Sequence, residues 1–141
     1  IMDAIKEKDA FLATGHISPE ESLILCREGR KRGVNMILTH PEFPRTRIGR
    51  DDQAELAKLG VVIEKNWFNL AQKSVMPEEM AETIRTVGSG HVYLATDRGQ
   101  KGAPTPVSEL KRFIAVMLTC GISEAQIRDM VQKVPEEVVC R

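Results

Sequence analysis

The stretch FLATGHISPEE, residues 11–21, contains the signals for a strand, a turn and the start of a helix. An apolar run rich in β-forming residues is followed by a Thr-Gly-His turn that ends at His16, and then by Ser18. Ser18 with Glu21 three residues later forms a capping box, and proline is favoured in the first turn of a helix. The stretch therefore predicts a βα unit with His16 at the carboxyl end of its strand.

The same arrangement recurs along the chain. Three further apolar runs suit buried strands, namely NMILTH (35–40), GVVIEKN (60–66) and HVYLATD (91–97). Helical patterns separate the runs, and two more helices are expected over 106–119 and 123–134, the second behind a Ser123/Gln126 capping box. The order βαβαβαβαα with short connections predicts a single α/β domain over residues 1–141, with a parallel sheet.

Polar residues stand at corresponding positions of these units. His16, His40 and Glu64 are spaced 24 residues apart, and Asp97 ends the fourth run. Because the carboxyl ends of parallel strands meet at one edge, where α/β sites are built, we expect these side chains to lie together. Side-chain alternation and a constant register predict an apolar inner face composed of Leu12, Met36, Leu38, Val62, Tyr93 and Ala95.

Two imidazoles and a carboxylate can hold a divalent metal ion, because these ligands suit zinc, and also manganese, iron or nickel. A bound ion lowers the pKa of its water to about 7, which makes a nucleophile available at neutral pH. We expect His16, His40 and Asp97 to be the metal ligands, and Asp97 to be the catalytic residue that accepts the proton. The alternative is that both histidines are hydrogen-bonded caps of strand ends.

Other polar residues near this edge have weaker signals. Arg45, Arg47 and Arg50 follow His40 in a loop, where guanidinium groups can bind a substrate carboxylate or phosphate, although a solvated loop explains them equally. Glu64 is either a further substrate-binding acid or a partner of the adjacent lysine.

His91 precedes its strand instead of following it. In a parallel sheet this position lies at the end opposite the expected site, so we expect His91 to be structural.

The composition narrows the class of partner. Twenty basic and twenty acidic side chains cancel, which predicts neither a nucleic-acid nor a membrane-surface partner and leaves a small-molecule substrate or contact with another protein. No run of about 18 apolar residues exists to span a bilayer. The three cysteines are widely spaced and odd in number, which argues against a disulfide framework and favours a reducing cytoplasm.

Four segments together resemble the carboxyl-terminal half of the amidohydrolase superfamily, within it an uncharacterised amidohydrolase-like branch. They are ATGHISPEE (13–21), ILTHPEF (37–43), ATDRGQ (95–100) and GISEAQIRDMVQKVPEEVV (121–139). Members of this superfamily are metal-dependent hydrolases on a TIM barrel. The resemblance implies that His16 matches the fifth-strand histidine, His40 the sixth-strand histidine and Asp97 the eighth-strand aspartate.

The superfamily's first-strand H-x-H pair and fourth-strand bridging ligand have no counterpart here. A closed barrel needs eight strands and about 250 residues, so we expect the carboxyl-terminal half of a (β/α)8 barrel whose amino-terminal half is absent from this sequence. Such a half is expected to form a homo-oligomer or to associate with the missing half. The alternative fold is an open, flavodoxin-like doubly wound sheet.

The expected function is hydrolysis of an amide, lactone or other ester-like bond of a small molecule by a metal-dependent enzyme. Two alternatives remain open from the sequence. One is a non-catalytic module that binds a small anion through the arginine loop, and the other is a half-barrel that serves assembly without activity.

Overall fold

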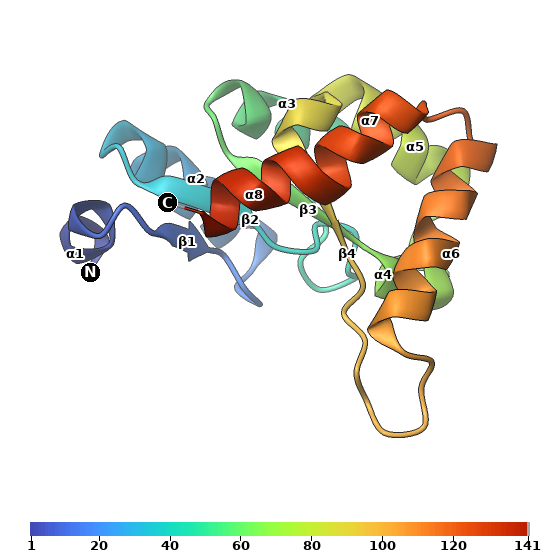
Figure 1. The fold of residues 1–141 in the computed structure, drawn as a ribbon. Helices are drawn as coiled ribbons and strands as arrows, with labels where there is room; N and C mark the ends of the chain where they lie inside the picture. Colours follow the sequence, from blue (N-terminus) through green and yellow to red (C-terminus); the bar gives the residue numbers. More distant parts are fainter. Residues whose placement is uncertain (141) are drawn as a thin grey trace.

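In a computed structural model, residues 1–140 are described, and they form an α/β fold in which parallel strands alternate with helices (Figure 1). The strands are β1 (Phe11–Ala13), β2 (Asn35–Leu38), β3 (Val62–Asn66) and β4 (Val92–Ala95), and they form one sheet in that order. The helices are α1 (Met2–Glu7), α2 (Pro19–Lys31), α3 (Arg50–Lys58), α4 (Trp67–Ala71), α5 (Pro77–Val87), α6 (Pro106–Thr119), α7 (Glu124–Arg128) and α8 (Val134–Val139). The four expected strands and their parallel order are confirmed.

The local start signals of the helices act as expected. Ser18 and Glu21 form a complete capping box at the start of α2, and the Ser123/Gln126 box opens α7. The helix expected over 123–134 instead continues to Val139, with a π-helical segment η2 (Asp129–Lys133) between α7 and α8. None of the helices within residues 1–140 has the length and apolar character needed to cross a bilayer.

The register of the sheet differs from the constant spacing expected from the sequence. Partners are 24 residues apart between β1 and β2, as in Leu12 with Met36, but 25 residues apart between β2 and β3, as in Leu38 with Ile63. A shift of one residue exchanges the two faces of a strand. The expected inner face was therefore wrong, because Leu12, Met36 and Leu38 lie on the face opposite to Val62 and its neighbours.

One face of the sheet forms the core. Met36, Leu38 and Ile63 are fully or almost fully buried, and Met36 packs so closely on α2 that a Cβ at Gly29 would meet its sulfur at 2.3 Å. The opposite face carries Val62, Tyr93 and other residues that are only half-buried. Segments η2 and α8 contact β4, and Figure 1 shows α7 and α8 continuing as one rod across the strands.

Candidate functional site

Two reciprocal hydrogen bonds join the loops that follow β1 and β2. The backbone N–H of Thr39 donates to Thr14 Oγ1 at 3.1 Å, and the backbone N–H of Gly15 donates to Thr39 Oγ1 at 3.2 Å. The pairing of these strands therefore continues past their last residues, and it brings the two following histidines to one edge.

His16 and His40 meet at this edge. Their Nε2 atoms lie 3.1 Å apart, and their ring centroids are 4.6 Å apart with a tilt of 51°. Two imidazoles on one tetrahedral zinc ion, with Zn–N distances near 2.0–2.1 Å, place their nitrogens about 3.3 Å apart. The pair therefore fits two positions of a zinc coordination sphere. A hydrogen bond between the two rings fits the same separation.

Thr46 faces His40 at two atoms. When the Thr46 hydroxyl donates to the backbone oxygen of His40 at 3.1 Å, its oxygen accepts from His40 Nδ1, also at 3.1 Å. The proton of neutral His40 then lies on Nδ1, and Nε2 presents its lone pair to His16. Metal-bound histidines are commonly oriented by such a bond from their second nitrogen.

Burial differs between the two rings. His40 is 5% exposed, whereas His16 is exposed to solvent. Phe43 packs on both, with ring centroids 5.5 Å from His40 and 6.2 Å from His16. The pair thus has a rigid, shielded side and a side open to an incoming ligand.

Two of the predicted ligands have a left-handed backbone. His40 has φ +31° and Asp97 has φ +50°, in a region that Asn, Asp and His adopt more readily than other L-residues. Asp9 and Lys73, which are not predicted ligands, also have positive φ, so this feature does not single out the site.

Asp97 follows β4 at the same sheet edge, and its side chain is exposed. Within residues 1–140, no group of three or more His, Cys, Asp or Glu side chains is placed to hold a metal ion. His16 and His40 are therefore brought together as a pair, and the ligand role of Asp97 stays a prediction.

Glu64 does not pair with Lys65, because adjacent residues of a strand point to opposite faces. One Glu64 oxygen accepts from the Tyr93 hydroxyl at 2.8 Å and the other from Asn66 Nδ2 at 3.2 Å. Burial, followed by the Glu64 charge, raises the pKa of Tyr93 above its ordinary value. Glu64 is thus an oriented carboxylate on the half-buried face of the sheet.

Lys65 points into the core and is 0% exposed. Its ammonium group donates to Glu42 and Gln53, and Gln53 is anchored in turn to the backbone oxygen of Ile48 at 2.8 Å. Burial lowers the pKa of Lys65, and the charge of Glu42 offsets part of that effect. This buried pair ties the loop after β2 to β3 and α3.

The three loop arginines do not act as one group. Arg47 donates to the backbone oxygen of Ser74 and connects the loop to the segment before α5, whereas Arg50, the first residue of α3, pairs with Glu82 on α5. Both line a cleft of about 430 Å³ between this loop and α5. Arg45 is exposed. The substrate-binding role expected for the three stays a prediction.

His91 lies in the short 3-10 segment η1 (Ser89–His91) that precedes β4. It is exposed and stands at the amino end of its strand, as expected. The loops that carry His16 and His40 lie at the opposite, carboxyl ends of their strands.

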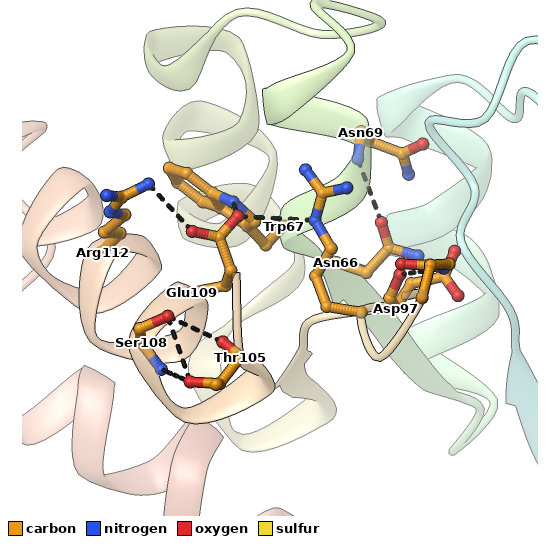
Figure 2. Close-up of polar contacts among 10 residues, drawn as sticks. Asn66, Trp67, Asn69, Asp97, Thr105, Ser108, Glu109 and Arg112 are labelled. Carbon is orange, nitrogen blue, oxygen red and sulfur yellow. Dashed lines mark hydrogen bonds and ion pairs between the residues drawn. The ribbon is translucent and has the colours of Figure 1, made fainter. Parts of the chain in front are cut away.

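A polar cluster beside β4 was missed at the sequence level. The Glu109 side chain on α6 is 3% exposed, accepts from the Trp67 indole and from Arg112 at 3.0 Å, and forms an ion pair with Arg98 at 3.4 Å. Figure 2 shows Glu109 between Trp67 and Arg112, with Asp97 and Asn66 across the cluster. No signal in the sequence joined these residues, because they come from three separate segments.

Comparison with known proteins adds one match. Residues 1–64 match the model of a family of unknown function, DUF6282. The match includes His16 and His40 and ends within β3, before Asp97. No curated protein and no solved structure matches the chain.

Proposed function

We propose that this chain contributes to a metal-dependent hydrolase of the amidohydrolase type, which acts on an amide, lactone or other ester-like bond of a small molecule. The observation that carries the proposal is the facing pair of Nε2 atoms of His16 and His40, 3.1 Å apart, with Nδ1 of His40 held by Thr46 at 3.1 Å. The resemblance to the amidohydrolase superfamily supports the same chemistry, and zinc is the expected ion, with manganese, iron or nickel as alternatives.

Each predicted site residue has its own role in this reaction. His16 and His40 hold the ion, which when bound polarises the scissile carbonyl and makes water more acidic. Asp97 accepts the proton released as water attacks the carbonyl, and then returns it to the leaving group. Asp97 has φ +50° and lies in the loop that follows the carboxyl end of β4.

The cysteines of the chain suit a reducing compartment. Cys26, Cys120 and Cys140 are free thiols. We place the protein in the cytoplasm and expect a small-molecule substrate without a nucleic-acid or membrane partner.

Metal analysis tests the proposal. Protein expressed with zinc and purified without chelators should retain the ion, and His16→Ala should lose it while the fold is unchanged, because His16 is exposed. His91→Ala is the matched control, since this exposed histidine lies at the other end of its strand.

Three results would count against the proposal. They are wild-type protein free of metal after metal-replete expression, His16→Ala with undiminished zinc, or an equal loss in His91→Ala. The first of these would favour a simple hydrogen bond between the two imidazole rings.

A further inference from the structure

Arg98 has an unusual environment for a guanidinium group. Its side chain is 15% exposed, and its buried Nε atom faces Glu109 Oε2 at 3.4 Å in an ion pair without a hydrogen bond. The Phe68 ring also contacts the group, with its centroid 5.4 Å from Cζ. Guanidinium has five N–H donors; the one on Nε is directed at Glu109, so the donors on Nη1 and Nη2 are the ones left for a ligand.

Glu109 cannot supply those bonds in full. One of its oxygens accepts a hydrogen bond from Arg112. The other accepts one from the Trp67 indole and also forms the ion pair with Arg98. Two guanidinium groups therefore share the carboxylate of Glu109, and these three side chains together carry a formal charge of about +1. The Arg98 fork is thus oriented by its neighbours but not saturated by them.

The position of Arg98 connects it with the candidate site. It follows Asp97 directly in the chain, in the loop after the carboxyl end of β4, and the loops of the two histidines follow the carboxyl ends of β1 and β2 in the same sheet. Asp97, with its positive φ, and the anchored side chain of Arg98 are therefore consecutive residues of that loop.

We propose that Arg98 binds a carboxylate group of the substrate, so that the scissile bond of an anionic amide, ester or lactone lies beside Asp97. A planar guanidinium and a carboxylate form two parallel charge-assisted hydrogen bonds, which gives orientation as well as affinity. The assignment rests on the proposed hydrolase, whose substrate class it narrows to carboxylate-bearing molecules.

Succinate binding to the metal-free protein tests this assignment separately from catalysis. Trp67 is the only tryptophan of the chain, and its indole donates to the Glu109 oxygen that faces Arg98. Succinate should change Trp67 fluorescence saturably when ionic strength is held constant with sodium chloride, and calorimetry should give the same dissociation constant. Chelation keeps the histidine pair from contributing through a metal.

The variants locate the binding. Arg98→Gln should weaken succinate binding by about tenfold or more, because a charge-assisted pair is lost. Arg112→Gln removes the other arginine partner of Glu109 and should bind succinate nearly as the wild type does, as should His16→Ala. Arg98→Lys keeps the charge without the fork and should bind with intermediate affinity, which provides a folded variant if the glutamine variant does not fold.

The outcomes separate the two proposals. Absence of saturable succinate binding to the wild type by both methods overturns the role of Arg98, even if the protein retains zinc. Equal weakening in Arg98→Gln and Arg112→Gln also overturns it, because charge alone would then explain the binding. Succinate binding that depends on Arg98 in a protein that retains no zinc would leave this role intact and remove the hydrolase.

Discussion

At the scale of single residues, local hydrogen bonds set the chemistry of the candidate site. Thr46 is 2% exposed, and its hydroxyl makes two hydrogen bonds with His40, one with the backbone oxygen and one with Nδ1. Replacing its hydroxyl would free both tautomers of His40, and in one of them Nε2 carries a proton and cannot bind a metal. Thr46 therefore acts on the site without contacting a ligand.

Thr46→Val should lower zinc affinity by about 10–100-fold, the usual effect of removing the partner that orients a metal-bound histidine. The shape of the side chain is retained but buried polar atoms of His40 lose their partner, so the free energy of unfolding should fall by about 1–3 kcal/mol. Competition with a fluorescent zinc chelator measures the affinity. Thr46→Ser retains the hydroxyl and is the control; similar affinities for wild type and Thr46→Val would contradict the role of the bond.

Tyr93 makes stability depend on pH in a predictable direction. Burial raises its pKa above the ordinary value of 10.0, so the tyrosine of the unfolded chain ionises first. Unfolding then releases a proton, and the free energy of unfolding should fall as pH rises above 10.0, while this contribution is fully present below that pH. Tyr93→Phe should remove this part of the loss.

Denaturant unfolding of both proteins at neutral pH and above pH 10.0 measures the difference, in which contributions from other groups such as Lys65 cancel. Tyr93 is the only tyrosine, so tyrosinate absorbance of the native protein also follows it directly. Parallel losses of stability in wild type and Tyr93→Phe, or native ionisation at the ordinary pKa, would contradict the expectation.

At the scale of elements, the sequence predicted best what is decided locally. The starts of α2 and α7 depend on capping boxes a few residues long, and both formed as expected. The sheet register depends on pairing between distant segments, and the constant 24-residue spacing did not reveal the extra residue between β2 and β3. The helix α4 was also missed, because it is short and follows β3 without a turn.

The same distinction applies to the candidate site. The spacing of His16 and His40 matches the register of β1 and β2, so their meeting followed from the sequence. Glu64 lies on β3, beyond the extra residue between β2 and β3, and the sequence did not predict its hydrogen bond with Tyr93. Glu109 and Arg98 come together only through the packing of α6 beside β4, which no local pattern encodes.

The buried pair of Lys65 and Glu42 joins β3 to the loop after β2, and removing one charge should cost more stability than removing both. Glu42→Leu leaves the ammonium of Lys65 buried without its carboxylate and should lower the free energy of unfolding by about 3–5 kcal/mol. The double variant Glu42→Leu with Lys65→Met removes both charges and should recover most of that loss.

Chemical denaturation of the single and double variants measures these energies. Arg50→Gln, which breaks an exposed ion pair with Glu82, is the control and should cost less than about 1 kcal/mol. A double variant as unstable as Glu42→Leu alone would mean that Gln53 or the packing around the pair, and not the charge, is responsible.

At the scale of the whole molecule, the two faces of the sheet are unequal. The face of Met36 and Ile63 is buried against helices, whereas the face of Val62 and Tyr93 is half-buried and carries the oriented carboxylate of Glu64. Strands β1 and β4 are the two outermost strands of the sheet, and outermost strands present unpaired backbone groups along one side. In a closed barrel, further strands would satisfy both edges and enclose the half-buried face.

We therefore expect the chain to associate through this face, either with a second copy or with a complementary half-barrel. Sedimentation of the purified chain should give a dimer or larger species. Val62→Lys places a charge at a half-buried position of this face, so it should shift the chain to the monomer with the fold retained. Ile24→Lys is the matched control, since Ile24 is 62% exposed on α2, the helix that covers the other face. A wild type that stays monomeric at all concentrations, or equal shifts in both variants, would exclude self-association through this face and leave the complementary chain as the only means of closing the sheet.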